Sequence, residues 1–449
     1  MGYTGNNRIG NSVGGTLSKY FEVALRSIMR TPSFIIIISC AFAALSAGQP
    51  SEAPPATRVE EIERARSVKE SMLKPEKVSD TERFLLNLKN RKWVERLTAG
   101  YNGFRIKIGN MVTGGGFALG PEYFREDLKD GNLTVRSSAQ FSTRGYTKYE
   151  AETALPKLWG NRLALNLVGS HRNYGGLSYY GPGPDSSVSG RTNYRLEDTS
   201  VDGIAVLRPA RYIKLGGSVG GLWVNVGPGN DSRYASTERV FPGLPGIDRQ
   251  TNHLRTSVFG QIDYRDNPNG PRSGGNYVFQ YSWYDDRKLG TFGFRRADID
   301  VQQYIPFLNK THRFALRAKA TFTESDRPEG TPFYLQPVLG GSDDLRGFRP
   351  FRFSDRNKIV YNAEYQWEIF AGLDSALFFD AGKVMPHRSQ LKFSDLETSA
   401  GFGLRFNVKN ATFIRVDVGF SHEGFQVWFK FNDAFNLRRF GTTTGQPVY

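Results

Sequence analysis

From Gly103 onward, apolar and polar residues alternate with a period of two over segments about ten residues long. Successive side chains of a β-strand point to opposite faces, so each segment predicts a strand with one apolar and one polar face. Near the end of the chain, Ile414 and Val416 oppose Arg415 and Asp417. We count about sixteen such segments, an even number, as a closed antiparallel bacterial barrel requires.

The charged character of the polar face decides between two all-β folds. A soluble β-sandwich would turn apolar side chains inward, whereas a wide transmembrane barrel encloses water and satisfies every backbone group around its ring. We therefore predict an all-β fold: a transmembrane antiparallel β-barrel of about 16 strands with a short N-terminal helical segment. Short connections alternate with long ones such as residues 326–356, and the strand parity places Arg346 on an outer loop.

The N-terminal part has a different pattern. Phe34 to Ala47 form an apolar run that is too short to span a bilayer as a helix, and basic residues precede it. We expect residues 1–48 to be a signal peptide region whose true start is Met29. A lipoprotein box ending at Cys40, the single cysteine, is the alternative for this region.

Charged residues at helical spacing follow, and we predict that residues 49–100 form a short helical periplasmic segment. The transmembrane β-barrel is expected over residues 101–435, with a C-terminal tail at 436–449.

Composition agrees with a barrel. The mean hydropathy of −0.45 is too low for a helical membrane protein, and aromatic residues reach 13%. The formal net charge is +15, but Lys and Arg recur singly along predicted strands, as at Arg313, Arg317 and Lys319. We therefore expect lumen charges and contacts with outer-membrane lipid, and no nucleic-acid partner.

Catalytic and metal motifs are weak. Gly216 to Gly220 match the G-x-S-x-G pattern around Ser218, but strand-like residues continue on both sides and no His and acid can be placed beside it. The five histidines have no metal-site spacing. We predict no catalytic residue, no metal and no cofactor. Asp343 and Asp344 are interpreted as solvated loop acids, with a calcium contact left open.

One loop carries distinctive chemistry, Leu339 to Phe348, which reads LGGSDDLRGF. Two carboxylates, Glu364 and Asp380, stand on polar strand faces after it, and such a group must meet water or a cation. The planar guanidinium of Arg346 suits pairing with a carboxylate. We hypothesise that the loop folds into the lumen and that Arg346 pairs with both acids. Gly341 and Gly347 would let its backbone turn tightly.

These residues also resemble a known family. Leu345, Arg346, Gly347 and Phe348 are similar to the [VIL]-R-G-[FY] tip of the inward-folded sixth extracellular loop of BamA/TamA family outer-membrane barrels, the bacterial surface antigens. Residues 378–384 resemble the F-x-D-x-G strand motif of that family, with Phe378 and Gly382 in place, and Glu364 sits where a partner acid lies. The resemblance covers about residues 103–435, and its specific motifs lie in the last third. No POTRA domain is recognisable before it.

The resemblance implies a barrel that assists insertion or translocation of proteins at the bacterial outer membrane. Its partners would be outer-membrane or secreted client proteins, and periplasmic or lipoprotein partners. The seam between Phe104 to Thr113 and Phe425 to Phe431 would open toward client strands. A passive pore or structural barrel without protein transport is the main alternative, favoured by the missing POTRA domain. An enzyme acting through Ser218 is a third.

Overall fold

The computed structural model describes residues 62–64, 66–69, 100–109, 111–308, 311–325, 327, 330–370, 372–408, 411–431 and 435. The chain divides into two compact units, Met1–Arg83 and Phe84–Tyr449. Residues 62–64 and 66–69 of the first unit are helical and exposed. The expected signal region, Cys40 and the C-terminal tail lie outside the described residues. No described helix combines the length and apolar character needed to span a membrane.

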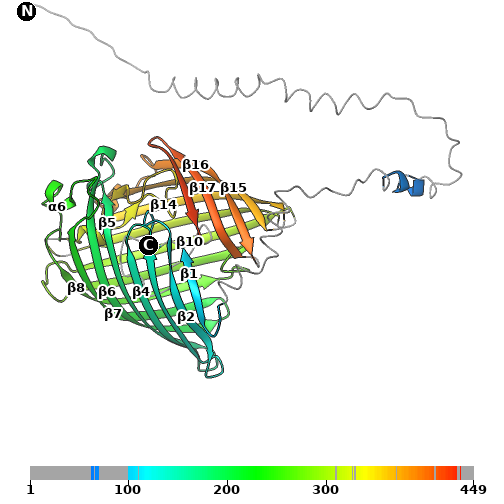
Figure 1. The fold of residues 1–449 in the computed structure, drawn as a ribbon, viewed down its shortest axis with the longest axis horizontal. Helices are drawn as coiled ribbons and strands as arrows, with labels where there is room; N and C mark the ends of the chain where they lie inside the picture. The colour runs from blue at the N-terminus through cyan, green and yellow to red at the C-terminus, as the bar shows by residue number, and fades with distance from the viewer. Residues whose placement is uncertain are drawn as a thin grey trace, which may run out of the picture. The chain divides into compact units, whose positions relative to one another are not determined.

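The second unit is built on one antiparallel sheet of 16 strands, in which each strand pairs with the next along the chain (Figure 1). The predicted fold class and strand number are confirmed. The strands are β1 (Phe104–Gly109), β2 (Ala118–Leu128), β3 (Leu133–Ser142), β4 (Thr147–Leu158), β5 (Leu163–Tyr179), β6 (Thr192–Ala210), β7 (Ile213–Pro228), β8 (Thr251–Asp263), β9 (Gly274–Asp286), β10 (Phe294–Phe307), β11 (His312–Glu324), β14 (Asn357–Phe370), β15 (Leu373–Met385), β16 (Glu397–Val408), β17 (Ala411–Ser421) and β18 (Gly424–Lys430).

Alternation along these strands separates an apolar outer face from a polar inner face. Phe402 and Phe420 are about half exposed, whereas Arg405, Arg415 and Asp417 on the same strands are almost completely buried. This is the reverse of a soluble protein, and it matches a sheet whose outer side chains meet hydrocarbon.

The two ends of the barrel differ in their connections. At the short-turn end, β6 and β7 are joined by two residues and β2 and β3 by four. At the long-loop end, β7 and β8 are joined through α6 (Thr237–Val240), and β11 and β14 through residues 325–356. The latter loop carries a separate ladder of β12 (Val338–Leu339) and β13 (Phe353–Ser354). Its residues enter the interior and pack with buried groups of the barrel wall.

The first strand is shorter than predicted. β1 ends at Gly109, so its predicted extension to Thr113 is wrong. Met111 and Val112 instead join the buried apolar cluster that includes Phe351 of the long loop. Burial of these two side chains inside the barrel therefore replaces continuation of the strand.

The sheet is not closed by strand pairing in the part of the chain that is described. No ladder joins β1 to β18, and these two strands form the edges of the sheet. We call the space between them the seam. Beside it, the ring centroids of Phe117 and Phe431 lie 5.7 Å apart.

The assignment of faces predicts the effect of a charge on the outer surface. Val258 of β8 is half exposed and apolar. For the barrel embedded in lipid vesicles, Val258→Lys should lower the free energy of unfolding by about 2 to 4 kcal/mol if the site lies near the bilayer midplane. Val258→Leu should leave it nearly unchanged. Urea unfolding of both variants measures the difference, and equal stability would show that this face does not contact hydrocarbon.

Candidate functional site

The tip of the β11–β14 loop is anchored inside the barrel by apolar packing. Leu345 and Phe348 are completely buried and form a cluster with Leu339, Phe353 and two side chains of the wall, Val360 and Val384. These contacts hold both sides of the intervening Arg346. The loop therefore reaches the inner wall through side chains that would be costly to return to water.

Arg346 is 2% exposed and binds two carboxylates of adjacent strands. Its Nε and Nη2 atoms donate to Asp380 Oδ2 and Oδ1 at 2.9 and 2.7 Å, and its backbone N–H also donates to Oδ2. Its Nη1 donates to Glu364 Oε2 at 2.6 Å. The structure thus brings together Arg346, Glu364 and Asp380, the three charged residues for which we predicted pairing from the sequence.

Phe378 supports the same guanidinium from β15. It lies two residues before Asp380 and so on the same strand face. The Arg346 Cζ atom is 3.5 Å from the centroid of its ring, a distance at which the negative face of the ring attracts a cation.

The ion-pair network is larger than the sequence predicted. Arg405 of β16 donates to Glu364 at 2.7 Å and to Asp417 at 2.5 Å. Arg415 of β17 lies 3.1 Å from Asp417 and donates to the Ser342 carbonyl at 3.0 Å. Three guanidiniums therefore face three carboxylates, and the members are almost completely buried. Alternation had already placed Arg415 and Asp417 on the polar face, but their contacts depend on the cross-strand register.

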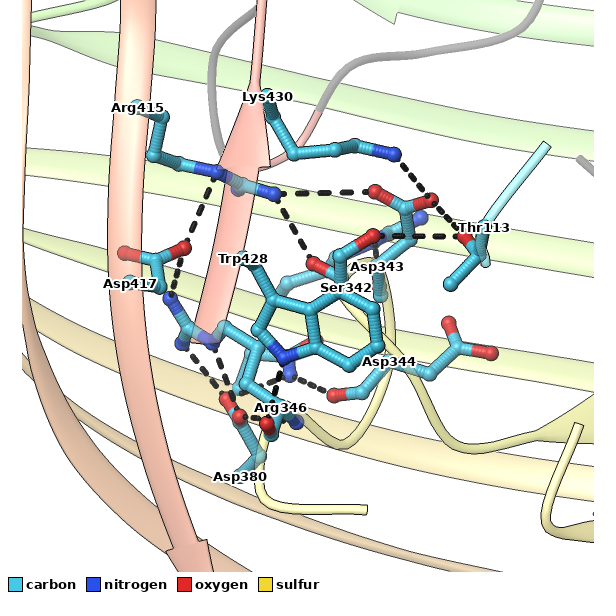
Figure 2. Close-up of polar contacts among 12 residues, drawn as sticks. Thr113, Ser342, Asp343, Asp344, Arg346, Asp380, Arg415, Asp417, Trp428 and Lys430 are labelled. Atoms are coloured by element: carbon cyan, nitrogen blue, oxygen red, sulfur yellow. Dashed lines mark hydrogen bonds and ion pairs between the residues drawn. The ribbon is translucent and has the colours of Figure 1, made fainter. Parts of the chain in front are cut away.

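Asp343 and Asp344 are also paired, and Asp344 is buried, which overturns its interpretation as a solvated loop acid, whereas the Asp343 side chain stays 34% exposed. Asp344 is 7% exposed and accepts from Lys358 Nζ at 2.7 Å. Burial alone would raise the pKa of Asp344, but the charges of Lys319 and Lys358 lower it well below its usual range. Asp343 accepts from Lys430 of β18 and from Thr113 (Figure 2).

Two glycines, Gly347 and Gly382, let neighbouring backbone segments approach closely. A Cβ atom on Gly347 would lie 2.6 Å from the Phe420 carbonyl oxygen and from Ser399 Cβ, so this glycine lets the loop touch the wall. It also lies in the expected tight turn, since the Phe348 N–H donates to the Leu345 carbonyl at 3.2 Å, but this turn does not use a positive φ at Gly347. Gly341 does have a positive φ, of 106°. A Cβ on Gly382 would lie 2.6 Å from the Ile359 carbonyl oxygen.

The last strands bind the backbone of the loop tip. Trp428 Nε1 of β18 donates to the Arg346 carbonyl at 2.7 Å (Figure 2). Ser421 Oγ of β17 donates to the Gly347 carbonyl at 2.9 Å. Thr113, which follows β1, donates to Asp343. The loop tip therefore contacts chain segments from both sides of the seam. This arrangement positions the loop against the wall.

Ser218 lies within β7, where its hydroxyl is 2.6 Å from that of Ser257. The strand continues on both sides, so the strand-to-helix turn of a nucleophile elbow is not formed there.

Comparison with known proteins gives a family match. Residues 131–432 match the Omp85 superfamily domain. Among solved structures, BamA from Haemophilus ducreyi lacking POTRA domains 1–3 has a TM-score of 0.55 at 13% identity, covering 74% of this chain and 70% of that one. CdiB from Escherichia coli has a TM-score of 0.50 at 13% identity, covering 74% of this chain and 62% of that one. At this identity, these likenesses show the fold. A search of curated protein sequences finds no match.

Removal of one charge should expose the coupling within the network. Asp380→Asn leaves Arg346 short of a buried counter-charge, and we expect it to lower the free energy of unfolding by about 3 to 5 kcal/mol. The double variant Arg346→Glu with Asp380→Lys should recover part of the loss. Urea unfolding in detergent measures both effects. If the single variants Asp380→Asn and Arg346→Glu were each as stable as the wild type, the fold would not depend on this ion pair.

The close approach at Gly347 gives a second prediction. Gly347→Ala should push the loop tip from the wall and increase proteolytic cleavage within residues 340–350, because the added Cβ meets backbone atoms. Gly227→Ala is the control, since nothing lies within 4 Å of a Cβ there. Limited proteolysis with mass spectrometry compares the two. Equal cleavage rates would show that close contact at Gly347 does not hold the loop.

Proposed function

Because the chain belongs to the Omp85 superfamily, we propose that it assists the insertion or translocation of other proteins at the outer membrane. The barrel fold of this superfamily implies an outer-membrane location. The clients would be outer-membrane or secreted proteins, and periplasmic or lipoprotein partners would deliver them.

The observation that carries this proposal is the pair of free strand edges at the seam. β1 pairs only with β2 and β18 only with β17 in the described sheet. The outward backbone N–H and C=O groups of an edge strand are a template for an added strand. In hydrocarbon, unsatisfied backbone groups are costly, which favours pairing with a client strand.

The loop tip supports a role in arranging that seam. Trp428 belongs to β18 and binds the carbonyl of Arg346, whose guanidinium is held by Asp380 and Glu364 on the wall. The ion pairs would fix the loop, and the loop would fix the inner face of β18. The outer edge of β18 would then remain available to a client strand.

A passive pore receives less support. Residues of the long loop occupy the interior near the long-loop end, and the side chains of Phe333, Tyr334, Leu335 and Phe348 there are almost completely buried. Such packing does not favour a wide lumen that conducts steadily.

A reversible cross-link across the seam tests the proposal. Phe117→Cys with Phe431→Cys replaces the two contacting rings beside the seam with thiols. A short, reducible cross-linker that reacts with two thiols would join them. We expect client insertion into liposomes to stop on cross-linking and to return on reduction. Thr199→Cys with Trp223→Cys joins strands that already pair, and its cross-linking should leave insertion unchanged.

Each single-cysteine variant, treated with the same reagent, controls for reaction at Cys40. Client insertion that persists after complete cross-linking of the seam would contradict the proposal. Steady ion conductance without client insertion would favour the passive pore.

A further inference from the structure

A separate cavity lies at the long-loop end, between the β11–β14 loop and the barrel wall. Its volume is about 300 Å³, and its lining includes three arginines, Arg144, Arg191 and Arg349. Among the described residues that line it there is no aspartate or glutamate. The cavity is therefore strongly positive, unlike the balanced network around Arg346.

The arginines of this cavity lack carboxylate partners among the described residues. Arg191 donates to two hydroxyl groups, through Nε and Nη2 to Ser178 and through Nη1 to Tyr234. The nearby acids form their ion pairs with arginines outside the lining. Glu423 pairs with Arg352 at 2.6 Å, and Asp231 pairs with Arg233 at 2.7 Å. Asp231 also attracts Arg191 at longer range, but one shared acid does not balance three arginines, so the cavity stays net positive.

A buried hydroxyl of the lining also lacks a partner. Tyr180 is 2% exposed, and its hydroxyl oxygen has no hydrogen-bond partner among the residues that the structure describes. Burial raises the pKa of Tyr180 although Arg191, Arg349 and Arg352 act in the opposite direction, so the hydroxyl keeps its proton. A buried donor without an acceptor is unfavourable, and an anionic oxygen would satisfy it.

We propose that this cavity binds a phosphate group carried by a sugar. Planar guanidiniums bind phosphate oxygens in pairs, and the Tyr180 hydroxyl supplies a further donor. The volume lies at the lower end of the range for small-ligand sites, and the rings of Tyr146 and Tyr234 line it. The sugar phosphate is either the headgroup of a membrane glycolipid or a soluble molecule.

Binding would join two parts of the molecule. Arg349 follows the loop tip directly, whereas Arg191 lies between η2 (Val188–Gly190) and β6 on the wall. A phosphate bound by both arginines would connect the loop to a second part of the wall. Arg191 there is far in sequence from Glu364 and Asp380, which hold the loop tip. Phosphate binding here does not require the proposed client handling to be correct.

The test measures binding to the full chain in detergent by isothermal titration calorimetry. The probes are glucosamine 1-phosphate, unphosphorylated glucosamine and inorganic phosphate. We expect saturable binding of the sugar phosphate at concentrations up to about 10 mM, and none of the unphosphorylated sugar. Arg191→Gln with Arg349→Gln should weaken binding at least about tenfold, by loss of charge-assisted hydrogen bonds.

Tyr180→Phe retains the ring and should weaken binding less than the double variant. Arg239→Gln is the matched control, since Arg239 is exposed on α6 at the same end and outside the lining. Circular dichroism and heat-modified electrophoretic mobility check that each variant is folded.

Vesicles containing a phosphorylated diglucosamine lipid separate the two sources of ligand. Tighter binding to these vesicles than to the soluble probe supports a glycolipid headgroup, and equal binding supports a soluble sugar phosphate. Absence of saturable binding, or equal weakening by Arg239→Gln, would overturn the proposal. Inorganic phosphate binding as tightly as the sugar phosphate would overturn the role of the sugar.

Discussion

The arrangement of the inner wall depends on the requirement that buried charges be neutralised. Removing an ion from water costs several kcal/mol even after relaxation, so Arg346, Arg405 and Arg415 are buried only because Glu364, Asp380 and Asp417 meet them. The network fixes one arrangement of β14 to β17 with the loop tip. A loop that left this position would leave carboxylates without their partner, which explains how a long connection is held inside a wide barrel.

Apolar and polar contacts share this task. Leu345 and Phe348 enter an apolar cluster on either side of Arg346, and Gly347 lets the backbone approach Ser399 and Phe420. The charged side chain alone would have freedom to approach its acids from several directions. Packing on both sides, together with the Trp428 hydrogen bond, restricts the backbone as well. Loop position and the position of β18 are thereby linked at the edge of the sheet.

Much of this could be predicted from the sequence because period-two alternation assigns each side chain to a face. It placed Glu364, Asp380 and Asp417 on the inner wall, and a loop arginine near two of them had an electrostatic reason to pair. The end of β1 was mispredicted because Met111 and Val112 fit a strand locally, and their burial depends on Phe351, distant in sequence. Asp344 appeared solvated because its partners Lys319 and Lys358 lie on strands flanking the loop. The positive cavity also combines residues from separate loops, and no local pattern encodes it.

The central claim is that Arg346 is in direct contact with Asp380 inside the barrel in a lipid bilayer. Solid-state nuclear magnetic resonance with ¹⁵N in the Arg346 guanidinium and ¹³C in the Asp380 carboxylate measures this contact through their dipolar coupling. The structure predicts a coupling of directly hydrogen-bonded groups, together with guanidinium protons shielded from bulk water. An uncoupled guanidinium that exchanges freely with solvent would contradict it.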